Sequence, residues 1–191
     1  PYWSNRRGEV MGKVMLSLVM LFLLAGCGPP RFFTVEEMDE QALRGAAAFH
    51  SKPVEWDFQR PDNWEISDQD WKEMYEVSNS AYQRVLVTEV NRKVYELAPG
   101  ASASSGAVID LRVNRIARGH YSFFTWGPAT LDAKLTITDA SSGKVLFRGS
   151  GVGRTQIQNA ETAGDGGRLK YAHTHLADEI EALLEYYSGK K

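Results

Sequence analysis

The stretch ATLDAKLTITD, residues 129–139, decides the fold class, because apolar and polar side chains alternate along its whole length. Successive side chains of a strand point to opposite faces, so this period of two predicts a strand with one buried and one solvated face. The apolar positions are Leu131, Ala133, Leu135 and Ile137, and the polar positions are Asp132, Lys134, Thr136 and Thr138.

Two neighbouring stretches extend this strand into a sheet. Upstream, GAVIDLRVNRIA (residues 106–117) places Ile109, Leu111 and Val113 on one face. Downstream, KVLFRGSG (residues 144–151) follows the short connection ASSG, where Gly143 can adopt a positive φ. We therefore expect an antiparallel meander of three strands with one wet and one dry face.

Two longer segments show helical periodicity. A helix is predicted from a Ser67 cap to about Lys93, with apolar side chains recurring every three or four residues. A second is predicted near the C-terminus, where the apolar positions step from Leu169 to Tyr187. Its outer face carries Asp178, Glu179, Glu181 and Glu185.

The region before the first long helix gives weaker signals. Thr34 and Glu37 have the spacing of a capping box, which predicts a short helix over residues 35–49. The following KPVEWDFQ, residues 52–59, alternates Val54, Trp56 and Phe58 and predicts a strand.

These elements predict an α+β fold. The dry face of the meander offers the apolar surface that two long amphipathic helices need. We expect a two-layer α/β sandwich with a mainly antiparallel sheet, a three-strand meander and both long helices on one face.

The N-terminal region has the features of a signal peptide. Residues 14–25, VMLSLVMLFLLA, form an apolar run preceded by Lys13. A helix that crosses a bilayer needs roughly 20 apolar residues, and this run is shorter. The segment therefore fits a signal peptide over residues 1–26, in which Met11 begins a well-formed short signal and residues 1–10 are upstream sequence.

The end of this region, LAGC at residues 24–27, resembles the lipobox of bacterial lipoproteins. The resemblance implies cleavage between Gly26 and Cys27 and a diacylglyceryl group on Cys27. A buried helix would be broken at once by GCGPP, and an ordinary secretory signal leaves the single cysteine of the chain unexplained. Gly28 stands where Asp retains lipoproteins in the inner membrane, which implies the outer membrane, or the outer leaflet of the cytoplasmic membrane in a single-membrane source.

This interpretation divides the chain into three parts. Residues 1–26 are the signal peptide, residues 27–51 a lipidated tether with a short helix, and residues 52–191 a periplasmic α/β domain.

The segment DLRVNRIARGHYSFFTWGPATLDAKLTITDASSGKVL, residues 110–146, resembles the core of bacterial lipoproteins of unknown function. Those proteins share a strand, a loop, a second strand and a D-A-x-S-G-K-V-L phrase, here residues 139–146. More loosely, the arrangement over residues 52–188 is similar to envelope domains related to the curli secretion channel and to the N-terminal domain of TolB.

Composition restricts the partners. The chain has 22 basic and 24 acidic residues, so it lacks the basic excess that a nucleic-acid partner requires. Without residues 1–26 it has 19 basic and 23 acidic residues and no polybasic patch for anionic headgroups. The expected partners are the membrane, through the lipid on Cys27, and other envelope proteins.

The polar motifs do not form a recognisable catalytic or metal site. His173 and His175 lie two apart on a predicted helix and diverge by about 200°, which favours exposed histidines over a metal pair. GSGVGR, residues 149–154, ends a strand and so favours a bulged or twisted edge strand over a phosphate loop. Glu55 and Asp57 fit solvated strand positions better than a carboxylate pair. We expect no catalytic residues, no metal and no cofactor.

The best candidate site is GHYSFFTWGP, residues 119–128, which lies between two predicted strands. Its aromatic side chains either fold over the end of the sheet or form an exposed contact for a partner, a lipid surface or an apolar ligand. The proposed contact residues are Tyr121, Phe123, Phe124 and Trp126.

Three hypotheses for function follow. The first is a non-catalytic lipoprotein that acts in protein interaction or envelope assembly through this aromatic segment. The second is a module that binds a lipid or another apolar ligand between sheet and helices. The third is a hydrolytic enzyme, although no G-x-S-x-G is present and no histidine or acid is tied by spacing to a serine.

Overall fold

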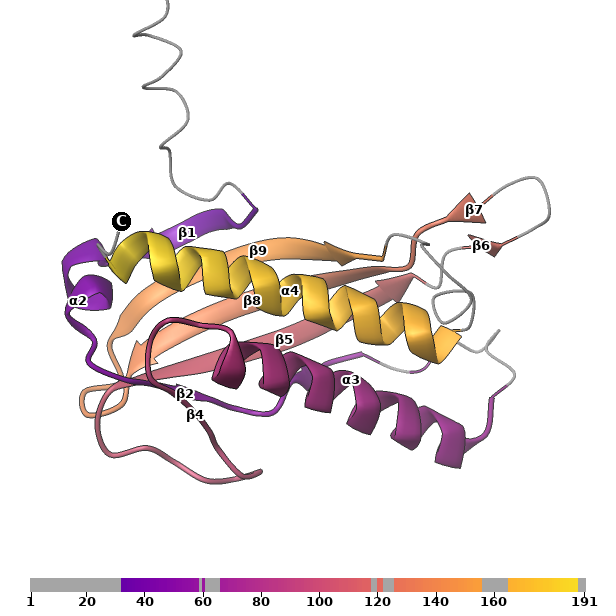
Figure 1. The fold of residues 1–191 in the computed structure, drawn as a ribbon, viewed down its shortest axis with the longest axis horizontal. Coiled ribbons are helices and arrows are strands. Elements are labelled where there is room, and N and C mark those ends of the chain that lie inside the picture. The colour runs from indigo at the N-terminus through magenta and orange to yellow at the C-terminus, as the bar shows by residue number, and fades with distance from the viewer. Residues whose placement is uncertain are drawn as a thin grey trace, which may run out of the picture. The chain divides into compact units, whose positions relative to one another are not determined.

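The computed structural model describes residues 32–58, 60, 66–117, 120–121, 126–155 and 165–188. In these residues a seven-stranded sheet carries helices on one face, and a separate two-stranded ribbon stands beside it (Figure 1). The strands of the large sheet are β1 (Thr34–Met38), β2 (Phe49–Ser51), β3 (Glu55–Trp56), β4 (Val94–Glu96), β5 (Ala107–Ala117), β8 (Thr130–Asp139) and β9 (Val145–Arg154). The ribbon consists of β6 (His120–Tyr121) and β7 (Trp126–Gly127), and the helices are α2 (Glu40–Gly45), α3 (Asp68–Thr88) and α4 (Asp165–Ser188).

The antiparallel meander β5-β8-β9 forms the centre of the sheet, as the sequence predicted. Around it the strand order is β1-β9-β8-β5-β2-β4, with β1 antiparallel to β9 and with β2 parallel to both β5 and β4. Strand β3 continues β2 along the same edge of β5, also in parallel. The two-layer α/β fold is confirmed, and β1 and β4 occupy opposite edges of the sheet.

Strand β8 shows the predicted alternation of burial. Its apolar side chains are fully or almost fully buried, and its polar side chains are half-buried on the other face. That outer face is covered by cross-strand charge pairs. Arg115 Nε lies 2.7 Å from Asp132 Oδ2, and Lys52 Nζ lies 2.8 Å from Asp110 Oδ2. Charges of both signs therefore keep this side of the sheet solvated.

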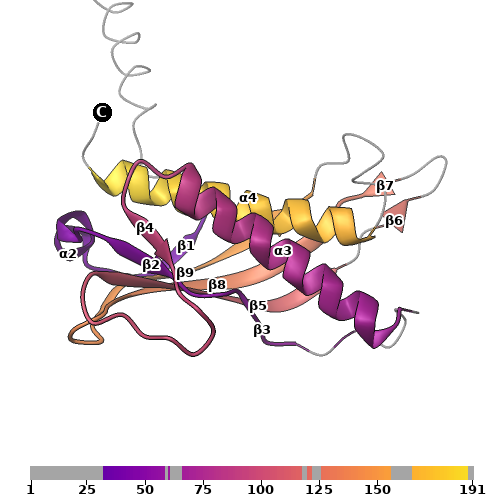
Figure 2. The same cartoon turned by 60° about the horizontal axis from the view of Figure 1, so that its bottom comes forward.

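Helices α3 and α4 lie side by side on the inner face of the sheet (Figure 2). Ser67 caps α3 as predicted, because its hydroxyl accepts a hydrogen bond of 3.1 Å from the Asp70 N–H. The helix ends at Thr88, before the predicted Lys93. None of the helices in the described part of the chain is apolar enough over its length to span a bilayer.

The helix predicted over residues 35–49 is wrong. The chain instead forms β1, then α2 and then the start of β2, and the cap of α2 is Asp39. Glu37 is not a capping-box residue, because its Oε2 lies 2.9 Å from Arg148 Nη1 on β9. Pairing with β9 outweighs the local capping signal, and the compact unit begins at Phe32, inside the segment that we expected to be a tether.

The glycines of β9 lie on the inner face and allow other elements to approach closely. A Cβ on Gly153 would lie 2.7 Å from the Ala172 carbonyl oxygen of α4, and a Cβ on Gly151 would lie 2.6 Å from the Phe32 ring. These glycines have extended backbone, so their role is to bring α4 and the N-terminal phenylalanines against the sheet.

The edge strand predicted over residues 149–154 is only partly an edge. Strand β1 pairs with β9 from Phe147 to Ser150, so the first two residues of the motif lie inside the sheet. Among the residues that the structure describes, no strand pairs with Gly151 to Arg154 on that side. The part of the motif that lies at the sheet edge is therefore Gly151 to Arg154.

The turn between β8 and β9 matches its prediction. Gly143 has a φ of +71°, in the region that disfavours residues with a Cβ. Hydrogen bonds from Ser141 and Ser142 to the Asp139 carboxylate hold the pKa of that carboxyl at about 2. Across the turn, Lys144 Nζ lies 2.6 Å from Asp39 Oδ2 and ties this hairpin to the α2 cap.

A Gly153→Ala substitution should lower the free energy of unfolding by about 1–3 kcal/mol, because the new Cβ would push α4 away from β9. Urea denaturation measures the change. Gly45→Ala is the matched control, since no atom lies within 4 Å of its added Cβ. Equal stability of the Gly153→Ala and parent proteins would contradict this account of the packing.

Candidate functional site

The predicted aromatic contact maps partly onto the β6–β7 ribbon. Tyr121 and Trp126 occupy paired backbone positions of this antiparallel ribbon. Phe123 and Phe124 lie outside the described residues, as do Gly26 and Cys27. The ribbon is not hydrogen-bonded to the large sheet as a further strand, and Figure 1 shows it beyond the end of β5 and β8.

A second aromatic cluster was missed by the sequence prediction. It surrounds Trp56 of β3, whose ring lies 4.8 Å from that of Trp71, 5.2 Å from that of Tyr75 and 5.4 Å from that of Phe58. These rings are half-buried and fill the space between β3 and the first turns of α3. The Tyr75 hydroxyl donates to the Val54 carbonyl at 2.6 Å, which fixes α3 to the chain before β3.

His173 of α4 completes this cluster. The prediction of an exposed histidine is wrong, because the residue is fully buried beneath Trp56. The Trp56 indole N–H donates to His173 Nε2 at 3.0 Å, and Nδ1 lies 2.8 Å from the Leu169 carbonyl oxygen. These partners assign a neutral ring with its proton on Nδ1. Burial lowers the pKa of His173 to about 4, although the contact with Leu169 opposes this shift.

The His175 side chain does not join the Trp56 cluster and contacts other residues. Its ring lies edge-on to Phe32 at a centroid distance of 5.2 Å, and its Nε2 lies 3.7 Å from Glu179 Oε1. His173 and His175 therefore contact different neighbours, as residues two apart on a helix should. The two imidazoles do not form a metal pair.

The predicted carboxylate candidates of β3 are exposed, as expected. Glu55 Oε2 lies 3.3 Å from Arg112 Nη2, so its charge is balanced across the β3–β5 pair. Asp57 continues the strand pairing through its backbone N–H, which donates to the Val113 carbonyl at 2.9 Å.

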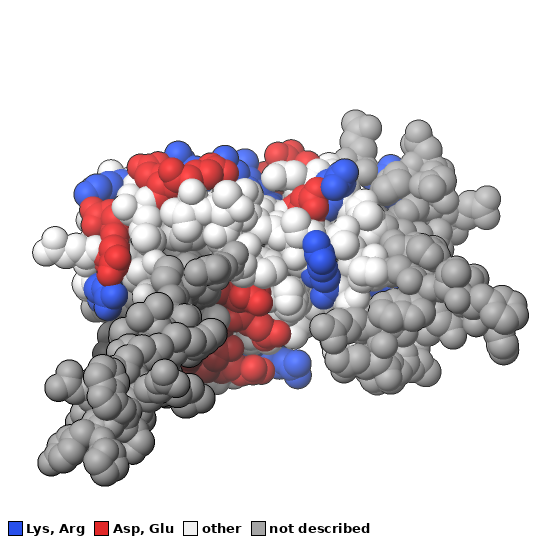
Figure 3. All heavy atoms as spheres, turned by 90° about the horizontal axis from the view of Figure 1, so that it is seen from above, with Lys and Arg blue, Asp and Glu red and all other residues white. Residues whose placement is uncertain are grey.

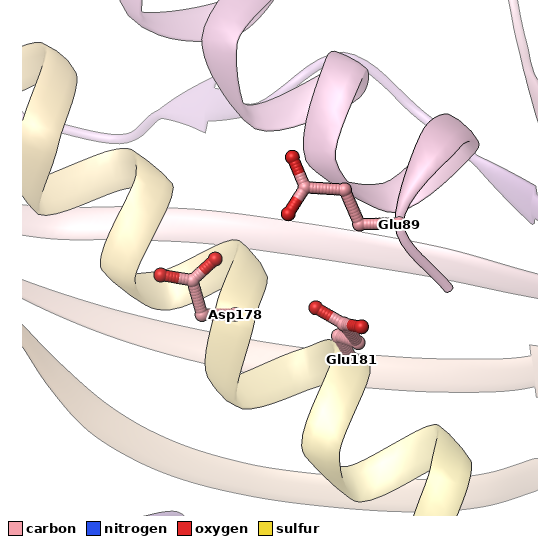
Figure 4. A group of neighbouring side chains, drawn as sticks. All are labelled: Glu89, Asp178 and Glu181. Atoms are coloured by element: carbon pink, nitrogen blue, oxygen red, sulfur yellow. The ribbon is translucent and has the colours of Figure 1, made fainter. Parts of the chain in front are cut away.

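Three other carboxylates gather between α3 and α4 (Figure 4). Glu89, at the end of α3, faces Asp178 and Glu181 of α4, and one carboxylate oxygen from each lies within 4.8 Å of the others. Partial burial, followed by the nearby charge of Glu89, raises the pKa of Asp178; partial burial, followed by the charges of Glu185, Glu89 and Asp178, raises the pKa of Glu181. Exposed acids commonly gather on helices without a ligand, so we assign no metal to them.

A hollow lies at the sheet edge next to Thr34, the first residue of β1. Residues 151–154 of β9 continue there without β1 beside them. The lining of the hollow includes Phe32, Thr34, Arg115, Ser150, Arg154 and His175. The Arg115 side chain is paired with Asp132, whereas the Arg154 side chain has no hydrogen bond or ion pair with another described residue. Figure 3 views the side on which β1 and β9 lie in Figure 1, and there acidic side chains gather in patches with basic side chains beside them.

Comparisons with known proteins find distant structural likenesses only. No family model matches the chain. No curated protein sequence matches it either.

Among solved structures, the hypothetical protein CT253 of Chlamydia trachomatis matches with a TM-score of 0.46 and 11% identity, over 75% of this chain and 99% of that one. PelC from Paraburkholderia phytofirmans, described as a dodecamer, matches with a TM-score of 0.40 and 12% identity, over 68% of this chain and 87% of that one. Lipoprotein GNA1162 of Neisseria meningitidis matches with a TM-score of 0.36 and 17% identity, over 60% of this chain and 86% of that one. Likenesses this distant do not assign an activity to the chain.

The buried histidine makes stability depend on pH. The folded-state pKa of about 4 lies below the ordinary value of 6.5, so the unfolded chain binds the proton more readily. The contribution of His173 to stability is complete above pH 6.5 and is lost as the pH falls toward 4, by roughly 3 kcal/mol in all. Urea denaturation between pH 4 and pH 7 should show this loss in the parent and in a His50→Gln control, but not in His173→Gln. If the stability of His173→Gln falls with pH as much as that of the parent, His173 is not the cause of the loss.

Proposed function

We propose that this protein is a non-catalytic lipoprotein of the bacterial envelope, anchored in the outer membrane by lipid on Cys27 and facing the periplasm. Its α/β domain acts in protein interaction or envelope assembly. The observation that carries the proposal is the position of the lipobox-like LAGC, which ends at Cys27, five residues before the compact unit begins at Phe32.

The order of these features matches what an anchored domain requires. An apolar run, a lipobox and a folded unit follow one another directly along the chain. Acyl chains contribute about 0.8 kcal/mol for each buried CH₂, so two or more chains hold a protein stably at a bilayer. The domain itself can therefore remain solvated, in keeping with the paired charges on its outer sheet face.

The β6–β7 ribbon is the proposed contact with a partner protein. A two-stranded ribbon has little capacity to bury aromatic rings by itself. Tyr121, Phe123, Phe124 and Trp126 are concentrated in this one short segment, which supports a role in binding rather than in the core. Tyrosine and tryptophan are also enriched where protein partners meet.

The packing gives less support to an apolar ligand held between sheet and helices. Along β9 the α4 backbone approaches so closely that a single added Cβ on Gly153 would lie 2.7 Å from the Ala172 carbonyl oxygen. The helix and the strand leave no space for a ligand there. A ligand-binding role would need a cavity elsewhere in the interface.

The anchor is tested by replacing the cysteine. Cys27→Ala should abolish acylation and leave an unprocessed precursor, because the thiol is the acceptor of the lipid. Mass spectrometry of the N-terminal peptide and detergent partition of the protein measure both effects. Gly28→Asp should keep the lipid but move the protein to the inner membrane. Acylation that persists in Cys27→Ala would refute the anchor.

The partner contact is tested with the anchored protein. Changing Tyr121, Phe124 and Trp126 to Ser should remove the envelope proteins that cross-link to the parent protein in intact cells, because the aromatic contact area is lost. The matched control changes Val77, Val87 and Tyr95 to Ser, since these side chains are exposed on α3 and β4. If the ribbon variant keeps every partner, the ribbon is not the contact.

A further inference from the structure

The length of chain between the proposed lipid and the domain restricts how the domain can sit on the membrane. This inference rests on the proposed anchor at Cys27. Residues 28–31, GPPR, are the whole connection between Cys27 and Phe32, and even fully extended they reach at most about 18 Å.

The far end of this connection is held firmly by the domain. The Phe33 side chain is only 3% exposed and lies edge-on to the ring of Phe147, at a centroid distance of 6.0 Å. Phe32 packs edge-on to Phe33 at 4.9 Å and covers Gly151 of β9. The point where the chain leaves the domain is therefore a fixed point on the β1–β9 edge of the sheet.

The β1 edge of the sheet lies close to the point where the chain leaves the domain, and the β4 edge lies far from it. Strand β1 begins two residues after Phe32, whereas β4 forms the opposite edge, five strand spacings or about 24 Å away. A connection of at most about 18 Å brings the β1–β9 edge close to the bilayer surface and leaves the β4 edge distant.

The chemistry of the β1–β9 edge suits lipid headgroups. Val35 and Met38 of β1 are 48% and 37% exposed, which is unusual for apolar side chains on an edge strand facing water. The acids of β1 are neutralised, because Glu36 Oε2 lies 3.2 Å from Lys134 Nζ and Glu37 pairs with Arg148.

Arg154 adds a cation that is not engaged by another described residue, at the hollow beside this edge. In contrast, the acidic group of Glu89, Asp178 and Glu181 lies on the helices. Asp132 also lines the hollow, but its carboxylate is paired with Arg115.

We propose that the β1–β9 edge rests on the headgroups of the bilayer that holds the lipid of Cys27, with Arg154 binding lipid phosphate. The exposed side chains of β1 then lie in the interface, and the β4 edge faces the periplasm. The guanidinium of Arg154 suits this role because its fork of N–H donors matches the oxygens of a phosphate.

The test uses the full-length acylated protein in vesicles of 70% phosphatidylcholine and 30% phosphatidylglycerol. Cys27 is the single cysteine and its thiol is consumed by the lipid, so one added cysteine takes a fluorophore uniquely. Ser150→Cys places the label on the proposed membrane edge and Glu96→Cys places it on β4. A nitroxide on the lipid headgroups should quench the Ser150→Cys label strongly and the Glu96→Cys label weakly. Thr34→Cys gives a second label on the same edge if Ser150→Cys does not fold.

The role of Arg154 is tested in the same vesicles. Arg154→Gln should shift the equilibrium away from the edge-down orientation by about fivefold, since one arginine near an anionic surface contributes about that factor. The quenching of the Ser150→Cys label should fall accordingly. Arg84→Gln, which removes the same charge from exposed α3, should leave it unchanged.

The outcomes separate the two proposals. Mass spectrometry of the same preparation first shows whether Cys27 carries lipid, and an unmodified cysteine overturns the anchor and the docking together. Acylated protein with equal quenching of the two labels overturns the docking alone. Strong quenching at Ser150→Cys that survives Arg154→Gln removes the phosphate contact from the proposal.

Discussion

The close contact between β9 and its neighbours is the constraint on which the rest of the domain depends. Three glycines alternate along the inner face of this strand, so the backbone of α4 and the rings of Phe32 and Phe33 lie directly against it. The N-terminal phenylalanines and the first half of α4 are thereby fixed to one strand. Strand β1 begins immediately after the two phenylalanines, and its position at the sheet edge follows from the same contact.

A second group of contacts joins the helices to the sheet on the other side of β5, at β3. Trp56 lies at its centre and touches α3 through Trp71 and Tyr75 and α4 through His173. The hydrogen bond from the Trp56 indole requires a neutral imidazole as acceptor, so the cluster depends on the protonation state of one buried ring. Glycines join α4 to the sheet at β9, and aromatic rings join it to the sheet at β3.

The elements predicted well from the sequence are those whose signals are local. The period of two in β8, the Ser67 cap and the turn glycine at position 143 depend only on nearby residues, and each has the expected structure. The failures depend on distant partners. Glu37 has the spacing of a capping residue but pairs with Arg148, and the burial of His173 depends on Trp56, 117 positions away. The candidate aromatic segment was found from composition, whereas the aromatic cluster at Trp56 forms only when three elements meet.

The proposed orientation also restricts the kind of partner that the ribbon can meet. Strand β7 ends at Gly127, three residues before Thr130, and Thr130 pairs with Arg154 in the sheet. The ribbon therefore leaves the domain beside the residue that we assign to lipid phosphate. With the β1–β9 edge on the headgroups, a protein that binds the ribbon must come close to the bilayer surface. A partner anchored or embedded in the same membrane satisfies this requirement, since its binding surface is already held at that height.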